Sequence, residues 1–182
     1  MLLAGALAWT GCVFRQTYPP TWPPRSADCL DVSGVYANVG ERWGSSVPFP
    51  FGRTVVETGH LCALLLDTSQ CANATQVRLS PGDASTLDVW VSADDLPATQ
   101  RSVPYSCTPR GAKISVPPRW VSQQLGVLRA WGDVYLSKNT DGDLTAKVIY
   151  YTYGVVLVVP IIGGGDLWYR FTPIVAVDAP PQ

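Results

Sequence analysis

His60 is the only histidine in the 182-residue chain and therefore the only imidazole that could act as a general base. It directly precedes the apolar residues 61–66, and the sequence contains no Gly-x-Ser-x-Gly motif that would present a nucleophilic serine. A partly buried histidine with one hydrogen bond is the favoured interpretation. The only glutamates, Glu41 and Glu57, fall in a loop region and give little support to paired catalytic carboxylates. We therefore expect that the protein is not an enzyme. A hydrolase is the last of the three functions considered for it below.

Cofactor and metal chemistry has equally little support. Residues 163–165 are three glycines without the lysine that a phosphate-binding loop needs. Residues 139–143 are spaced like the start of a calcium loop, but Tyr150 stands where that motif requires glutamate. The cysteines form no Cys-x-x-Cys pair, so a zinc site is not expected. The sequence predicts no cofactor.

Cys12 follows ten uncharged residues, 2–11, that end in small side chains. Ten residues are too few to span a bilayer, which takes about 20, but they suit the apolar part of a secretion signal. This order resembles the lipobox of bacterial lipoproteins, although Trp9 stands where leucine is usual. The resemblance implies removal of residues 1–11 as a signal peptide and acylation of Cys12, with palmitate as one of the chains. Val13 resembles the pattern that sorts lipoproteins to the outer membrane, facing the periplasm.

The residues after Cys12 are rich in proline, with two proline pairs around Thr21 and Trp22. Proline pairs neither continue a helix nor join the interior of a sheet, and they favour an extended conformation of about 3 Å per residue. We therefore expect residues 12–28 to form a tether between a membrane and the domain. The alternative is a buried N-terminal strand or helix in which Cys12 is an incidental thiol.

The remaining cysteines are even in number, as expected for disulfides in an oxidising compartment. They are Cys29, Cys62, Cys71 and Cys107. Four cysteines allow three pairings, and the short spacing between Cys62 and Cys71 favours a local bridge, leaving Cys29 with Cys107. Buried free thiols are the alternative.

Composition indicates a β protein without a nucleic-acid partner. Hydrophobic residues make up 47% and charged residues 15%, and a net charge of −1 gives no field to attract nucleic acid. Sixteen glycines and sixteen prolines argue against a helical bundle. Turn residues recur about every 8–12 positions, which is typical of all-β folds. We expect residues 29–174 to form one small antiparallel barrel or sandwich, with a lipocalin-like barrel among the options.

Two hairpins are explicit in the pattern. Residues 77–79 and 87–91 alternate in polarity on either side of a Pro-Gly-Asp turn. Residues 134–136 and 144–151 alternate around a turn that contains Asp-Gly.

The C-terminal part is predicted from apolar runs and glycines. The run at residues 155–162 predicts a strand buried on both faces. Residues 163–165 predict a turn into a last strand at 167–171, and residues 175–182 a flexible tail.

Aromatic residues are dense for a chain of this size. Eight of them could line an apolar ligand cavity, and the foremost candidates are Trp90, Trp131, Tyr150 and Trp168. The others are Trp120, Tyr151, Tyr153 and Tyr169. The alternative is that these side chains fill the core, because each aromatic ring buries about 150–250 Å².

Three segments together resemble a group of uncharacterised proteobacterial lipoproteins. They are residues 29–38 (CLDVSGVYAN), residues 141–144 (DGDL) and residues 168–171 (WYRF). The resemblance implies an envelope location and a single β domain, and it carries no activity or catalytic residue. The expected role is structural or protein-binding, with a membrane as partner through the lipid anchor and an envelope protein as a further partner. A lipocalin-like carrier of a small apolar or lipid ligand is the main alternative.

Overall fold

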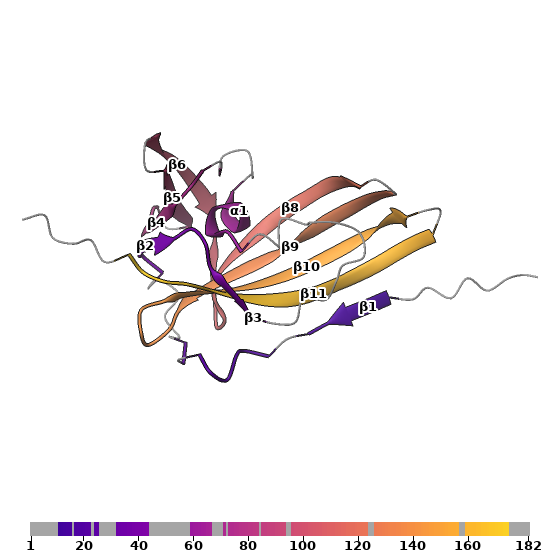
Figure 1. The fold of residues 1–182 in the computed structure, drawn as a ribbon, viewed down its shortest axis with the longest axis horizontal. Helices are drawn as coiled ribbons and strands as arrows, with labels where there is room; N and C mark the ends of the chain where they lie inside the picture. The colour runs from indigo at the N-terminus through magenta and orange to yellow at the C-terminus, as the bar shows by residue number, and fades with distance from the viewer. Residues whose placement is uncertain are drawn as a thin grey trace, which may run out of the picture.

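The computed structural model describes residues 11–15, 17–22, 24–25, 32–43, 59–66, 71, 73–83, 85–93, 96–123, 126–156 and 159–174. Within these ranges the chain forms eleven strands and one short helix, arranged as two sheets (Figure 1). The prediction of an all-β fold is confirmed.

The larger sheet contains seven of the strands found in the described ranges, in the order β1-β11-β10-β9-β8-β7, with β3 pairing with β11. Their bounds are β1 Gly11–Phe14, β3 Glu41–Trp43, β7 Ser106–Thr108, β8 Gly111–Gln123, β9 Gly126–Lys138, β10 Leu144–Val156 and β11 Val159–Phe171. Neighbours are antiparallel except for β1, which runs parallel to β11. The four strands β8 to β11 have 13 residues each and form two long hairpins side by side.

The turn between β9 and β10 is held by Asn139. Its side-chain Oδ1 accepts hydrogen bonds from the backbone N–H groups of Asp141 at 3.0 Å and Asp143 at 2.8 Å. Gly142 adopts φ +87°, a conformation that side-chain-bearing residues rarely take. This confirms the hairpin predicted around residues 139–142.

The smaller sheet is antiparallel, in the order β2-β4-β5-β6 among the described residues. Its strands are β2 Gly34–Ala37, β4 Gln76–Pro81, β5 Thr86–Ala93 and β6 Leu96–Pro104. Val77 pairs with Val91 and Leu79 with Val89, so the other predicted hairpin is also confirmed.

The hydrophobic core lies between the smaller sheet, helix α1 (Leu61–Leu65) and one face of the larger sheet. On β10 the alternate residues Leu144, Ala146 and Val148 belong to this core, and Tyr150 packs at its border. We call this the inner face of the larger sheet and the opposite one the outer face. The described strands thus form a sandwich at one end of the molecule, and their two sheets are open rather than closed into a barrel.

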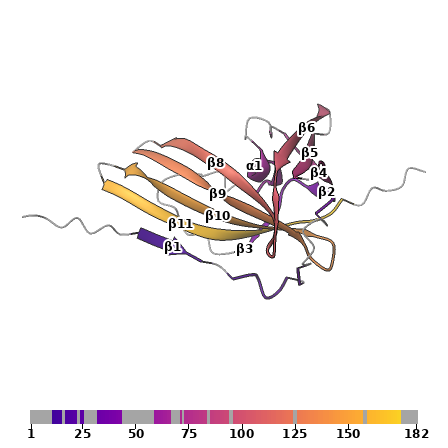
Figure 2. The ribbon, with the colours of Figure 1, turned by 180° about the vertical axis from the view of Figure 1, so that it is seen from behind.

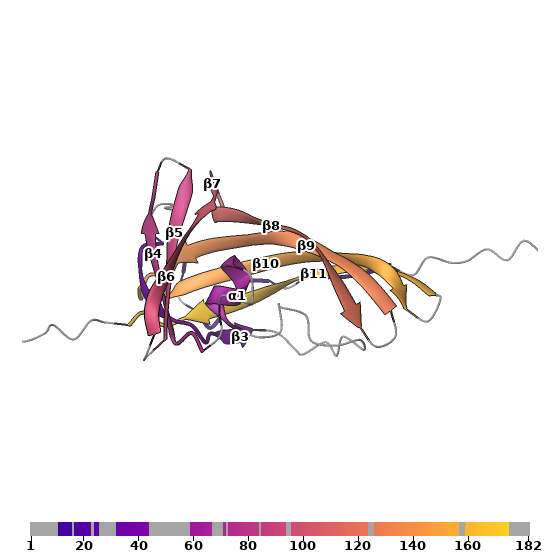
Figure 3. The ribbon, with the colours of Figure 1, turned by 90° about the horizontal axis from the view of Figure 1, so that it is seen from above.

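The two long hairpins extend well beyond the smaller sheet and α1 (Figures 1 and 3). On β10, six more strand residues follow Tyr150 before the strand ends at Val156. The hairpin ends therefore project away from the core.

Two predictions for the C-terminal part are wrong. Residues 155–162 were expected to form one strand buried on both faces, but β10 ends at Val156 and β11 begins at Val159. Val155 and Ile162 are exposed, since the run lies where the hairpin extends past the smaller sheet. The glycines at 163–165 do not turn the chain but lie inside β11, next to β1 on one side and β10 on the other.

We call the end of the larger sheet that packs against the smaller sheet its base. The N-terminal segment packs along the outer face at this base. Trp22 is buried, and the Tyr18 ring meets the Trp168 ring edge-on at 5.0 Å. The Arg25 guanidinium lies 4.9 Å from the centre of the Trp168 ring, and the Thr140 N–H donates to the carbonyl of Pro24 at 2.9 Å. The described residues of the expected tether thus contact the domain, because their aromatic rings gain more by burial than they would in a free spacer.

Candidate functional site

Four aromatic side chains gather on the outer face where the hairpins leave the core. Trp131 stacks on Tyr151 with ring centroids 5.8 Å apart. Tyr153 lies edge-on to Trp131 at 5.7 Å and to Trp120 at 6.4 Å. These side chains come from β8, β9 and β10 and occupy two adjacent cross-strand rows. We call Trp120, Trp131, Tyr151 and Tyr153 the aromatic belt.

Arg129 is the only charged side chain in the two rows of the belt that the structure describes. Its guanidinium lies 5.9 Å from the centre of the Trp120 ring, and its Nη1 donates to the Tyr153 hydroxyl at 3.4 Å. A cation over an exposed aromatic ring contributes about 0.5–1 kcal/mol. Arg129 is therefore held against the belt rather than directed freely into solvent.

The surface around the belt is unusually apolar. Six of the eight large hydrophobic side chains exposed in the described part of the chain lie on this face. Trp120 is 66% exposed, and the others range from 40% for Tyr153 to 49% for Val155. The row beyond the belt consists of Val127, Val155, Pro160 and Ser122. We call Val127, Val155 and Pro160 the apolar end; a contiguous surface of this kind marks an interaction site.

A β-bulge places Trp120 on this face. The register of β8 against β9 shifts between Val116, which packs against the core, and Arg119. If β8 paired with β9 without this bulge, strict alternation would put Trp120, four residues after Val116, on the same face as Val116. The bulge turns the Trp120 side chain outward to join the belt.

Charged side chains begin one row below the belt, toward the base of the sheet. The Lys147 ammonium lies 2.7 Å from the Asp166 carboxylate, and the Lys113 ammonium lies 3.1 Å from the Asp133 carboxylate. The hydrogen bond and the negative charge of Asp133 raise the pKa of Lys113. The belt thus separates an apolar zone at the hairpin ends from a charged zone on the same face.

A depression of about 410 Å³ adjoins the belt on its charged side. Its lining includes Tyr151 and Ile149, the acidic Asp166 and three cationic side chains, which are Arg15, Arg110 and Lys147. Since Asp166 is already paired with Lys147, the remaining charge of the depression is positive. An anionic group fits this chemistry better than an apolar ligand.

The strand that contains Cys12 lies at the level of the belt. Cys12 pairs with Gly163 in β11, and Gly163 pairs with Thr152 in β10. Thr152 stands between Tyr151 and Tyr153, so the backbone of Cys12 lies between the two rows of the belt. Its strand, β1, lies along the β11 edge of the sheet (Figure 2). β1 runs from the hairpin ends toward the base.

The four aromatic residues singled out from the sequence do not share a cavity. Trp131 belongs to the belt on the outer face, whereas Tyr150 packs against the core on the inner face. Trp168 is buried under Tyr18. Trp90 lies on the smaller sheet, where the Arg78 guanidinium stands 5.4 Å from its ring centre.

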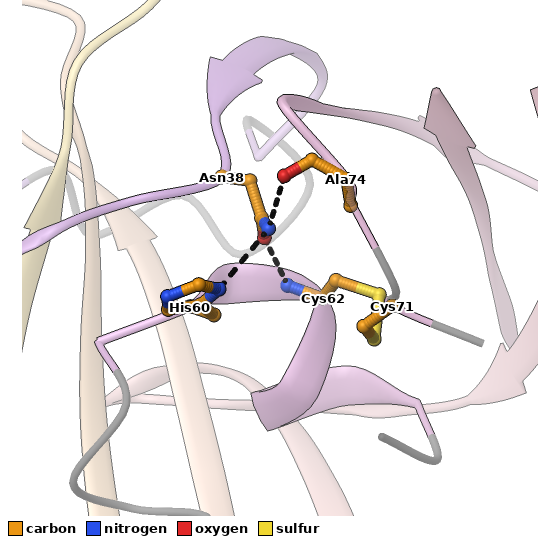
Figure 4. The surroundings of a disulfide bond; sticks show 5 residues. All are labelled: Asn38, His60, Cys62, Cys71 and Ala74. Atoms are coloured by element: carbon orange, nitrogen blue, oxygen red, sulfur yellow. Dashed lines mark hydrogen bonds between the residues drawn. A yellow bond between two sulfur atoms is a disulfide. The ribbon is translucent and has the colours of Figure 1, made fainter. Parts of the chain in front are cut away.

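The predicted disulfide between Cys62 and Cys71 is present (Figure 4). Cys107 is also disulfide-bonded, and Cys29, its expected partner, lies outside the described residues. His60 precedes α1, and its Nδ1 lies 3.5 Å from Nδ2 of the buried Asn38. The same Asn38 amide donates to the Ala74 carbonyl and accepts from the Cys62 N–H, both at 2.8 Å. In this structure His60 therefore belongs to the polar network around Asn38 at the start of α1.

The described part of the structure holds neither a cluster of metal ligands nor a membrane-spanning helix. Among the residues it describes, no three His, Cys, Asp or Glu side chains gather as a metal site. No helix in the same ranges is long and apolar enough to cross a membrane.

Comparison with known proteins gives no relative for this chain: no family model matches it, and no similar curated protein or solved structure was found.

Sequence reasoning counted all four belt residues among the dense aromatics but did not predict that they gather on one face. Only Trp131 was among the foremost candidates, because Trp120, Tyr151 and Tyr153 reach this face through strand register and a bulge. A usable signal was present in β10, where Tyr151, Tyr153 and Val155 alternate along one face beyond the last core residue.

Proposed function

We propose that this protein is a bacterial envelope lipoprotein, held at a membrane by acyl chains on Cys12. Its role is structural or protein-binding rather than catalytic. The observation that carries the proposal is the register of β1, which puts the Cys12 backbone level with the aromatic belt. Tryptophan and tyrosine concentrate at the membrane–water interface, at the depth of the headgroups. Acyl chains attached at this level would enter the lipid while the belt stays at its surface.

The contacts of the described residues in 17–25 support a short connection between the lipidated residue and the domain rather than a long free tether. Because Tyr18 and Trp22 pack on the base of the sheet, the domain is held close to the lipidated end of the chain. The sorting pattern at Val13 favours the outer membrane, with the domain in the periplasm. The resemblance to proteobacterial lipoproteins agrees with this location.

An interaction role is better supported than a carrier role. The inner face at the base of the sheet is filled by core side chains such as Leu136, Leu144 and Tyr169. The depression beside the belt is lined by cations, which suits neither an apolar nor a lipid-chain ligand. An exposed apolar face next to an anchor is instead expected of a protein that works against a surface.

The mass of the intact protein extracted from membranes of the producing bacterium tests the proposal. We expect a chain that starts at Cys12 and carries a diacylglyceryl group and a further acyl chain. The Cys12→Ala variant is the matched control and should gain no acyl mass. An unmodified wild-type chain that retains residues before Cys12 would contradict the proposal.

A further inference from the structure

We infer that the ends of the two long hairpins, β8–β9 and β10–β11, themselves enter the lipid layer. The aromatic belt then lies at the headgroups, and the apolar end, Val127, Val155 and Pro160, lies among the acyl chains. The inference rests on the proposed anchor at Cys12 and adds a second membrane contact, made by the protein surface and not by the acyl groups.

The chemistry of the outer face changes along the strands in the order that a bilayer surface requires. The apolar end comes first, then the belt, and then the ion pairs Lys147–Asp166 and Lys113–Asp133. The sequence carries no charged residue from 148 to 165 or from 120 to 128, which covers the outer part of both hairpins. Charges at these positions would make a water-exposed hairpin more soluble. In a lipid-inserted hairpin they would oppose insertion, because transferring a charged side chain into hydrocarbon is costly.

The length of the hairpin ends fits insertion into a single leaflet. Between the pair Thr152–Gly163 and the hairpin end, each strand has four residues. In β10 they run to Val156, and in β11 they start at Val159. Four strand residues cover about 13 Å, slightly less than half of a hydrocarbon core that is about 30 Å thick. A spanning strand needs about 9–11 residues, so these ends dip into the membrane without crossing it.

The edges of the inserted part are also protected. Unpaired backbone groups are costly in lipid, and β1 pairs with β11 from Ile162 to Gly165 at the level of the belt. On the opposite edge, Pro117 and Pro118 of β8 have no N–H group to leave unsatisfied. Both edges therefore present fewer free donors where the sheet meets the membrane surface.

Cationic groups lie where lipid phosphates would be. Arg129 is held within the belt by Trp120 and Tyr153, from where its guanidinium can reach the headgroups. Arg15 and Arg110 line the depression on the water side of Tyr151. Binding should therefore be stronger to anionic than to neutral lipid and should weaken with salt.

Vesicle flotation tests the inference on the full chain that carries Cys12→Ala and hence no acyl group. The probe is a vesicle of phosphatidylethanolamine and phosphatidylglycerol in equal parts, compared with a vesicle of phosphatidylcholine alone. We expect the variant to float with the anionic vesicles. We also expect Trp120→Ala, added to it, to lower the partition coefficient about tenfold, since burial of on the order of 60 Å² of apolar surface corresponds to a factor of ten.

Two further variants separate insertion from simple folding defects. Val155→Asp adds a charge to the apolar end and should abolish flotation, whereas Trp90→Ala removes a tryptophan from the smaller sheet and should leave it unchanged. Because Trp120 and Val155 are exposed, both variants should keep the thermal unfolding midpoint of the parent chain.

The outcomes distinguish this inference from the proposal on which it rests. An acylated wild-type chain together with no flotation of Cys12→Ala would overturn hairpin insertion and leave the lipoprotein proposal standing. Equal flotation of the Val155→Asp and parent chains would also overturn it. The inference likewise fails if the chain is a dimer without vesicles and Trp120→Ala makes it a monomer, because the belt would then bind a second copy.

Discussion

The backbone of Cys12 pairs with that of Gly163, and this pairing fixes where an acyl chain on Cys12 would leave the protein. Gly163 lies on β11 between the two rows that carry the aromatic belt. The proposed anchor and the aromatic belt therefore share one end of the larger sheet. The smaller sheet and α1 lie at the other end (Figure 3). Under the proposed anchoring, the sandwich would face away from the membrane, where it could meet a partner.

Replacement of Asn38 by alanine should destabilise the domain. The Asn38 side chain is buried, accepts the Cys62 N–H and donates to the Ala74 carbonyl. Without it both backbone groups lose their partner, so we expect the free energy of unfolding to fall by about 2–4 kcal/mol. Urea denaturation measures this loss, and exposed Thr140→Ala should change stability by less than about 0.5 kcal/mol. Equal midpoints for Asn38→Ala and wild type would show that the network contributes nothing.

The disulfide between Cys62 and Cys71 should hold the first turn of α1 against the segment that leads into β4. The two cysteines are nine residues apart, and closing a loop of that size contributes about 2–3 kcal/mol in the chain-entropy model. The double variant Cys62→Ala, Cys71→Ala should show this loss in chemical denaturation under oxidising conditions. If wild type and double variant unfold at the same denaturant concentration, the bridge is not a source of stability.

The N-terminal segment should resist proteolysis as long as its aromatic contacts hold. Trp22 is buried between Tyr18 and Trp43, with the Arg170 guanidinium 5.5 Å from its ring centre. Trp22→Ala should raise the rate of trypsin cleavage after Arg25 by on the order of tenfold or more, because each 1.4 kcal/mol of lost local stability opens the site tenfold more often. Trp120→Ala is the control and should leave this rate alone. Identical rates for wild type and Trp22→Ala would mean that the segment is not held by its aromatic side chains.

Alkaline pH should loosen the same segment. Burial raises the pKa of Tyr18, although the charges of Arg25 and Arg170 lower it in part. An unfolded tyrosine ionises near pH 10, so the stabilisation is fully present below about pH 10 and is lost as the pH rises through the higher pKa of the folded state. The difference between the phenolate absorbance titrations of wild type and Tyr18→Phe measures this residue alone. A difference curve with its midpoint at or below that of free tyrosine would contradict the packing.

The sequence predicted the fold at the level of patterns that are local. The alternation of Val77, Leu79, Val89 and Val91 and the Asp-Gly turn after Asn139 depend on neighbours along the chain, and both hairpins were correct. The run at residues 155–162 was misjudged because apolar character indicates burial, whereas Val155 and Ile162 are exposed and no second sheet among the described strands covers this part of the hairpin. Its burial, if the inference holds, is supplied by lipid.

The candidate site could be predicted only in part. Trp131 was identified, but the belt as a whole depends on the register of three strands and on the bulge before Arg119. Neither feature has a local signature that fixes it. The packing of Tyr18 and Trp22 on Trp168 was missed for a related reason: proline pairs predict an extended chain, which fits a free spacer and a segment lying along a sheet equally well.

Fluorescence quenching by brominated phospholipids tests the central claim, that the Cys12 anchor and the belt occupy one membrane, most directly. The acylated protein that starts at Cys12 is placed in vesicles with bromine either near the glycerol or near the end of the acyl chains. We expect the stronger quenching from bromine near the glycerol, and we expect the variant Trp120→Phe, Trp131→Phe to lose most of it. Tryptophan emission that is the same with and without bromine would place the belt outside the membrane and contradict the account.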